Sequence, residues 1–94
     1  MTRNEYLKAL EEKLERLDAE IAKLKIKSER AGADLKAGYE DILAGLRLKR
    51  VEMQPRLKEL KRAGDEAWIE VKDGLEVSWK DLKNAVGHAV SRFK

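Results

Sequence analysis

Few side chains in this sequence are of the kinds that catalyse reactions or bind metals. His88 is the only histidine and there is no cysteine, so the sequence excludes thiolate nucleophiles, thiolate metal sites and disulfides. Carboxylates are paired at positions 11–12 and 65–66, but nothing around them predicts a pocket that would raise the pKa of a carboxyl group. The sequence therefore predicts no catalytic, cofactor-binding or metal-binding residues, and a protein that is not an enzyme.

Positive charge is concentrated in one segment, residues 47–62. This segment holds seven basic residues against two glutamates, whereas the whole chain carries a formal charge of only +3. A nucleic-acid-binding protein needs such a basic surface, but no aromatic or base-reading side chains accompany these charges. We interpret the segment as solvated helix surface and expect no nucleic-acid partner.

Two tryptophans, Trp68 and Trp79, are spaced so that they lie on one face of a helix. They are eleven residues apart, which is close to three helical turns. One interpretation is that they anchor a core between helices. The alternative is that residues 66–92 form a surface-active helix like those of exchangeable apolipoproteins, with lysines at the boundary of its apolar side. Four carboxylates argue against binding of anionic lipid: Glu70, Asp73, Glu76 and Asp81.

The tryptophans belong to a longer apolar pattern. Every eleventh residue from 24 to 90 is large and apolar: Leu24, Leu35, Leu46, Leu57, Trp68, Trp79 and Val90. A strict heptad precedes this track: Leu7, Leu10, Leu14, Leu17, Ile21 and Leu24. Both spacings place an apolar stripe on a long helix, and such a stripe must be buried. We predict that these residues form the core or an interface, and that the zipper of residues 7–24 pairs with a second copy of the chain.

The overall composition also favours helix. Charged residues make up 41% of the 94 residues and aromatic residues 5%, and there is a single proline. These values are typical of coiled coils rather than of compact globules. No apolar run has the length of a membrane span or the pattern of a signal peptide, so we expect one cytoplasmic domain.

The predicted fold class is all-α. A long amphipathic helix is expected over about 2–62, a break over 63–65, and a shorter helix over about 66–92 that folds back as an antiparallel hairpin or coiled coil. The alternative is a three-helix bundle, in which Gly32 and Asp34 end the first helix and begin a second. The hairpin is preferred because the heptad frame continues through this region without a change of phase.

Several residues carry signals for the ends and bends of these helices. Thr2 and Glu5 have the spacing of a capping box at the first helix start. At the break, Gly64 suits a left-handed C-cap and Asp65 suits an N-cap. Pro55 is expected to kink the long helix rather than to end it.

Closure of the hairpin makes a further prediction about the aromatic residues. It would bring Trp79 near residues 46–50 and Phe93 near residues 35–38. Gly38 and Gly45 of the long helix would then make room for aromatic rings.

Several short elements of the sequence together resemble a known family. The most specific are Ala63-Gly64-Asp65-Glu66-Ala67-Trp68, the second tryptophan, and the ending Ser91-Arg92-Phe93-Lys94. Less specific are Tyr6-Leu7, Leu10-Glu11, Asp18-Ala19-Glu20-Ile21, Lys23-Leu24-Lys25 and Leu57-Lys58-Glu59-Leu60. Over nearly the whole chain these elements resemble small bacterial coiled-coil proteins described as stress-response proteins and first named in cyanobacteria. The resemblance implies a soluble helical protein that is not an enzyme and has no catalytic residues.

These observations lead to one expected function and one alternative. We expect a non-enzymatic coiled-coil protein that forms a homo-oligomer and acts as a structural or protein-interaction module. The resemblance adds a role in a stress response, and an unknown protein partner is compatible with this function. The alternative is reversible binding to a membrane surface or lipid through the amphipathic helix of residues 66–92.

Overall fold

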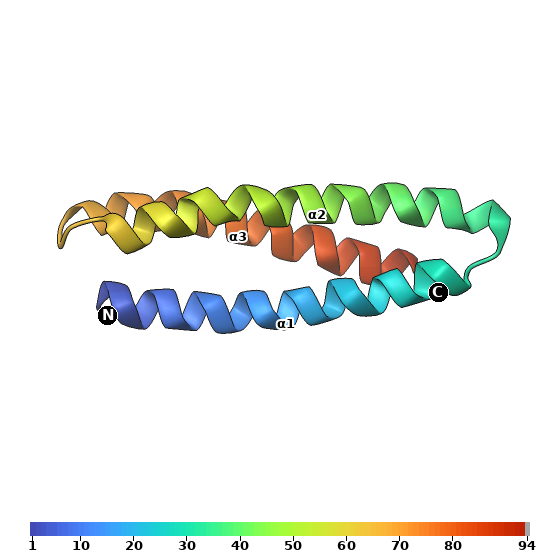
Figure 1. The fold of residues 1–94 in the computed structure, drawn as a ribbon, viewed down its shortest axis with the longest axis horizontal. Helices are drawn as coiled ribbons and strands as arrows, with labels where there is room; N and C mark the ends of the chain where they lie inside the picture. Colours follow the sequence, from blue (N-terminus) through green and yellow to red (C-terminus); the bar gives the residue numbers. More distant parts are fainter. Residues whose placement is uncertain (94) are drawn as a thin grey trace.

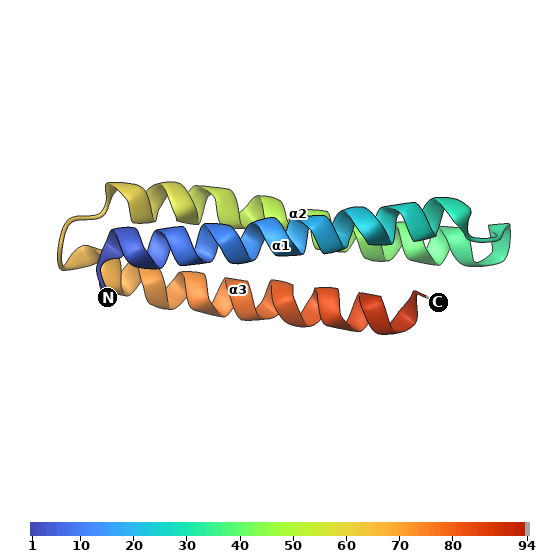
Figure 2. The same ribbon diagram turned by 90° about the horizontal axis from the view of Figure 1, so that it is seen from below.

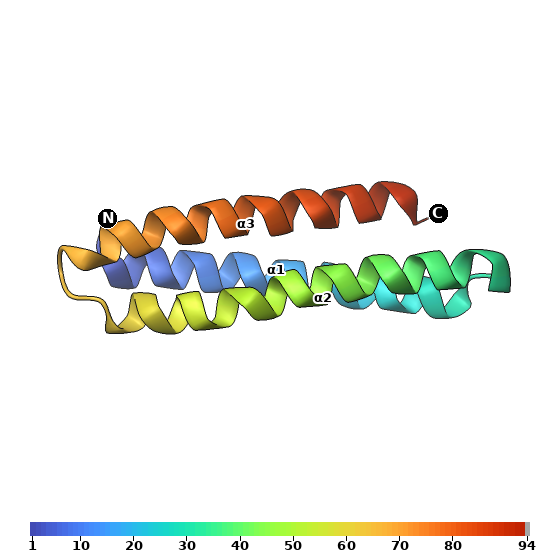
Figure 3. The same cartoon turned by 90° about the horizontal axis from the view of Figure 1, so that it is seen from above.

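The computed structural model describes residues 1–93, and this range contains three α-helices: α1 (Arg3–Arg30), α2 (Ala33–Arg62) and α3 (Ala67–Arg92). The chain runs along the bundle, back, and along it again, so that α1 and α3 are parallel and α2 is antiparallel to both (Figure 1). Figure 2 and Figure 3 show from two opposite sides that the three helices lie side by side over most of their length. The Cα atoms extend over 51 × 17 × 17 Å. The all-α prediction is confirmed, and the architecture is the three-helix bundle rather than the hairpin.

The prediction of one helix over about 2–62 is wrong, because the chain reverses at Ala31 and Gly32. Ala31 ends α1 with φ −70° and ψ 152°, and Gly32 precedes α2 with φ −64° and ψ 160°. Two successive extended residues therefore make the turn, and Asp34 lies in the first turn of α2 rather than at its N-cap. The heptad phase continues because the connection is so short, and unbroken phase was therefore a poor argument against a turn.

The break before α3 lies close to the predicted place, but its caps differ from the prediction. Ala63 ends α2 in an extended conformation, and its N–H donates to the carbonyl oxygens of residues 59 and 60. Gly64 has no positive φ, so the predicted left-handed C-cap does not form. Glu66, not Asp65, precedes the first residue of α3, and its side chain makes no capping hydrogen bond. The guanidinium group of Arg3 donates to the carbonyl oxygen of Ala63 and so ties the start of α1 to the end of α2.

The capping box at the start of α1 is confirmed. The N–H of Glu5 donates to Oγ1 of Thr2 at 3.1 Å, and the N–H of Thr2 donates to Oε1 of Glu5 at 3.1 Å. The hydrogen bond from the N–H of Thr2, with a smaller contribution from the Thr2 hydroxyl, favours the ionised carboxylate and holds the pKa of Glu5 below its ordinary value.

The leucine heptad of α1 faces the inside of its own bundle. Leu7 is half-buried and the other members are buried: Leu10, Leu14, Leu17, Ile21 and Leu24. The side chains of α2 and α3 in the same core include Met53, Leu60, Leu75 and Leu82, which are completely buried. The stripe that was predicted to pair with a second copy is thus covered by α2 and α3 of the same chain. The heptad leaves no exposed zipper for a second copy.

The elevenfold track is only partly inside the bundle. Leu24, Leu46 and Leu57 are buried, Trp68 and Trp79 are half-buried, and Leu35 and Val90 are 52% and 43% exposed. Helix α3 ends at Arg92, and the ring of Phe93 stacks on Tyr39 with 4.0 Å between ring centroids. Leu35 precedes Tyr39 by one turn of α2 and lies beside a hollow at the end of α3, which leaves half of its surface exposed. The track does not form one continuous buried seam.

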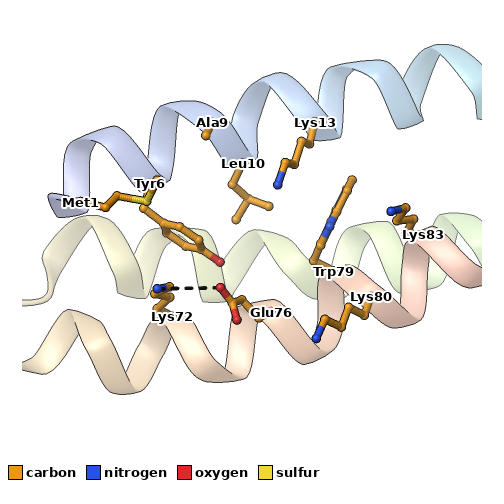
Figure 4. Close-up of a pocket in the computed structure, with 10 residues that line it drawn as sticks. All are labelled: Met1, Tyr6, Ala9, Leu10, Lys13, Lys72, Glu76, Trp79, Lys80 and Lys83. Atoms are coloured by element: carbon orange, nitrogen blue, oxygen red, sulfur yellow. Dashed lines mark ion pairs between the residues drawn. The ribbon is translucent and has the colours of Figure 1, made fainter.

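The remaining sequence signals fall within α2 and α3. Helix α2 continues through Pro55, so the chain has no loop there. A Cβ atom built on Gly38 or Gly45 would meet nothing within 4 Å, so these glycines do not make room for an aromatic ring. Phe93 packs on Tyr39, one residue beyond the predicted range. The ring of Trp79 faces α1 (Figure 4).

Candidate functional site

Ion pairs bridge two of the three seams between helices. Between α1 and α2, Nε of Arg50 donates to Oδ1 of Asp18 at 2.8 Å. Between α2 and α3, Nζ of Lys49 donates to Oδ2 of Asp81 at 2.6 Å. These pairs are partly or fully exposed, so they add little to stability, but they match the charges of the facing helices.

The third seam differs because of the residues that flank the heptad of α1. The flanking row that faces α2 is acidic and meets basic residues: Asp18 pairs with Arg50, and Glu11 lies 3.5 Å from Nζ of Lys61. The flanking row that faces α3 consists of Tyr6, Lys13 and Glu20. In a coiled coil, residues in these rows decide how neighbouring helices match. The row toward α3 thus contains an aromatic, a basic and an acidic residue, and its charged residues form no ion pair with the described residues of α3.

Outside the apolar core, aromatic rings and ammonium groups contact one another along the seam of α1 and α3. The ring of Tyr6 lies 6.2 Å from that of Trp68, and Nζ of Lys72 lies 5.4 Å and 5.9 Å from the two ring centroids. Further along, Nζ of Lys13 lies 5.9 Å from the centroid of Trp79. Within residues 1–93, no ion pair joins α1 to α3. These contacts are cation–π interactions, which leave the ammonium groups able to bind an anion as well.

An open groove runs along this seam, and we call it the α1–α3 groove. It consists of two adjoining hollows of about 420 Å³ and 530 Å³ that share Lys13, Trp79 and Lys83. The first hollow is also lined by Met1, Tyr6, Ala9, Leu10, Lys72, Glu76 and Lys80, and the second by Arg16, Leu17, Ala19 and Glu20. Figure 4 shows Trp79 extending from α3 toward α1 with Lys13 and Lys83 on its two sides. The groove therefore has an apolar floor and a charged rim.

The rim of the groove is mainly basic. Five cationic side chains line it, from Lys13, Arg16, Lys72, Lys80 and Lys83, against two carboxylates from Glu20 and Glu76. Lys72 lies 3.9 Å from Glu76 on the same helix (Figure 4), whereas the other four cations form no ion pair with any described residue. Unpaired cations beside an apolar floor would attract an anionic partner with apolar groups of its own.

Tyr6 forms one end of the floor. Its side chain is buried, and burial raises the pKa of the phenol to about 12, with smaller contributions from the carboxylates of Glu76 and Asp73. Burial favours the uncharged phenol because the phenolate loses its hydration in the bundle. At physiological pH the ring is therefore neutral, and it acts as an apolar surface rather than as an acid or a base.

The basic segment of residues 47–62 is largely engaged within the bundle. Four of its basic residues contact neighbouring helices: Lys49 pairs with Asp81, Arg50 with Asp18, Lys61 with Glu11, and Arg56 donates to the carbonyl oxygen of residue 74 at 3.4 Å. These contacts point toward two different seams, so the segment does not present all its charges on one surface.

Sequence reasoning missed Tyr6 and Lys13, which line the groove beside the heptad of α1. The heptad pattern identifies only the apolar positions of α1, whereas Tyr6 and Lys13 lie in the row beside it. A signal was present in the spacing, because Tyr6 and Lys13 are seven residues apart and therefore share a face of the helix. Which neighbour that face would meet depends on the turn at Gly32, and the turn was not the preferred prediction.

Other residue types that could carry chemistry do not converge in the described structure. His88 is exposed on α3, and residues 1–93 contain no group of three histidine, aspartate or glutamate side chains arranged to hold a metal ion. Over the same residues, no helix combines the length and apolar character needed to cross a bilayer.

Comparisons with models of protein families, with curated proteins and with solved structures find no match for this chain. The resemblance to small bacterial stress-response proteins therefore stays a prediction, as does the role in stress that it implies.

Proposed function

We propose that this chain is a non-enzymatic protein-interaction module that binds a partner through the α1–α3 groove. The observation that carries the proposal is the contrast between the seams of the bundle. Ion pairs bridge the seams of α2 with α1 and with α3, whereas within residues 1–93 none bridges the α1–α3 seam, which has an apolar floor and four unpaired cations along its rim. A groove of this kind is a typical docking surface for a protein segment.

The rest of the bundle suits a scaffold that presents this surface. Leu14, Met53, Leu60, Leu75 and Leu82 fill the core, and no buried polar side-chain atom of the described residues lacks a hydrogen-bond partner. Residues on rigid helices hold a binding surface more firmly than residues on loops. Homo-oligomerisation, a stress role and a cytoplasmic location remain predictions from the sequence, and the buried heptad no longer supplies a reason for the first.

The alternative function, reversible membrane binding through residues 66–92, requires a larger change. The apolar side of α3 includes Leu75, Leu82 and Val86, all of which are buried in the bundle. To bind a membrane by that side, α3 would have to leave α1 and α2, which would expose their apolar surface to water. The groove needs no such opening, and for this reason we favour a protein partner.

Site-specific photo-crosslinking in the cells of origin tests the proposal. A photoreactive residue would replace Ala19, which lines the groove, or Ala44, which is exposed on α2 and lines none of the hollows described. Both positions are alanines in the interior of a helix, so the two variants are matched. The proposal predicts discrete protein adducts from position 19 that are absent at position 44. Equal adducts at both positions, or none at either, would contradict it.

A further inference from the structure

We infer that the occupant of the α1–α3 groove is an acidic amphipathic helix of another polypeptide, which lies antiparallel to α1 and α3. This inference rests on the proposed function and specifies the chemistry of the partner.

The parallel arrangement of α1 and α3 favours a helix as the occupant of the groove. The two helices are parallel, and α2 already packs against both from the opposite side of the bundle (Figure 1, Figure 2). A fourth helix in the groove would complete a four-helix bundle, and an antiparallel direction would place its dipole favourably against both neighbours. The lining residues of α1 run from Tyr6 to Glu20, which corresponds to a groove about 20 Å long. A partner helix of about four turns would fill it.

The charges of the rim specify the residues of the partner. Lys13 and Arg16 on α1 are three residues apart, and so are Lys80 and Lys83 on α3. Each pair therefore lies on one side of its helix, and the two pairs border the groove on opposite sides. A complementary helix would carry carboxylates along both edges of a narrow apolar stripe. The stripe would contact Trp79, Leu10 and Leu17 on the floor.

A second copy of this chain fits the groove less well than such a partner. The outer side of α3 does carry exposed carboxylates at Glu70 and Asp73 beside the exposed Val77. The same helix continues into Lys80 and Lys83, however, and these lysines would face the basic rim of the other copy. Only half of this helix is therefore complementary to the groove.

A single-headed anionic lipid also matches the groove less well. Its one charge would satisfy one end of the rim, whereas the unpaired cations are distributed along both helices at Lys13, Arg16, Lys80 and Lys83. The groove is also open along its length, so an acyl chain lying in it would remain partly in water, at a cost in free energy.

The test uses the full chain and two designed peptides of about 16 residues without tryptophan. The acidic peptide has leucines with the i, i+3/i+4, i+7 spacing of an amphipathic helix and glutamates along both edges of this stripe, and its basic twin has lysine at every glutamate. Titration calorimetry and the tryptophan fluorescence of the chain measure binding, and circular dichroism measures the helix that the peptide gains. We expect the acidic peptide to bind at least about tenfold more tightly than the basic twin at low salt.

Charge-reversal variants locate the binding. Lys80→Glu with Lys83→Glu changes the rim, whereas Lys36→Glu with Lys58→Glu changes the net charge equally on exposed residues of α2 outside the groove. The rim variant is expected to bind the acidic peptide about tenfold less tightly, and the α2 variant to bind nearly as the natural chain does. All four positions are exposed, and circular dichroism checks that both variants keep their helices.

Several outcomes would overturn the inference. Equal binding of the two peptides, or equal losses in the two variants, would mean that the charges of the rim do not select the partner. Self-association that is abolished by the rim variant would identify a second copy as the occupant, and binding of phosphatidylglycerol vesicles in preference to the acidic peptide would identify lipid. If position-specific adducts form in cells but the acidic peptide does not bind, the proposed function stands and only this inference falls.

Discussion

Gly38 and Gly45 provide a sharp test of how α2 packs. Both lie in the interior of α2, neither has a positive φ, and a Cβ atom at either position would meet nothing within 4 Å. Alanine therefore fits both sites without displacing a neighbour. Glycine in the interior of a helix costs about 1 kcal/mol relative to alanine, mainly because glycine loses more backbone entropy on folding.

Gly38→Ala and Gly45→Ala should therefore each raise the free energy of unfolding by about 1 kcal/mol. The sites are seven residues apart on one helix, or about 10 Å, so the two gains should add to about 2 kcal/mol. For a domain of this size, that gain corresponds to a rise in Tm of roughly 8–16 °C. Thermal and urea melts followed by circular dichroism at one protein concentration measure both quantities.

Gly74→Ala is the matched control for this pair. Gly74 also lies in a helix interior, but a Cβ atom there would be 3.3 Å from Nη1 of Arg56, which donates to the carbonyl oxygen of Gly74. The gain at this site should be smaller than at Gly38 or Gly45, because the guanidinium group must move. Destabilisation by the Gly38 and Gly45 changes would refute the reasoning, since it would mean that another helix approaches α2 closely at these glycines.

Three further predictions test the core, the groove and the first helix start. Leu57→Ala should lower the free energy of unfolding by about 2–5 kcal/mol because Leu57 is 6% exposed, whereas Leu48→Ala should change it by no more than about 0.5 kcal/mol because Leu48 is 61% exposed. Equal losses for the two variants in urea melts would contradict this. The phenol of Tyr6 has a pKa of about 12 in the folded chain and ionises from its ordinary pKa near 10 in the unfolded chain, so between pH 10 and 12 the natural chain should lose at most about 3 kcal/mol of unfolding free energy relative to Tyr6→Phe. If the unfolding free energies of the two proteins depend on pH in the same way, Tyr6 is not buried as described. Thr2→Ala should lower the free energy of unfolding by about 1 kcal/mol and move the pKa of Glu5 back toward its ordinary value in an NMR titration. An unchanged pKa would mean that the hydroxyl of Thr2 has no influence on the carboxylate.

Local patterns in the sequence predicted helices and their faces well. The capping box of Thr2 and Glu5, the burial of most of the heptad and the break before α3 all depend on residues close together in the chain. The observed exposure of Leu48 also agrees with helical periodicity, because this residue lies on the opposite side of the helix from Leu46.

The turn at Gly32 could not be deduced from the heptad, because an intact heptad phase suits both a continuous helix and a very short connection. Because the turn was not the preferred prediction, the predicted packing partner of the heptad was also wrong. A straight helix over residues 2–62 would have left the heptad for a second copy, whereas the turn brings α2 onto it. The exposure of Leu35 follows from the same turn, since it places that residue beside the open end of the bundle, where α3 ends.

The groove was the least predictable feature. Its rim joins Lys13 and Arg16 of α1 to Lys80 and Lys83 of α3, residues more than 60 positions apart that meet only once α1 and α3 are parallel. The sequence showed Trp79 as a large apolar residue on one face of its helix. It did not show that this ring would be half-buried beside unpaired lysines.

The indole N–H signals of the two tryptophans test the central claim most directly. A ¹⁵N–¹H NMR spectrum of this chain has two such signals, because Trp68 and Trp79 are its only tryptophans. Trp79 lines the α1–α3 groove, whereas Trp68 packs on Tyr6 and lines neither hollow. On addition of the acidic peptide, the account predicts a saturable shift of the Trp79 signal that is larger than any shift of Trp68. Binding of the peptide with the Trp79 signal unmoved would contradict the assignment of the groove as the binding surface.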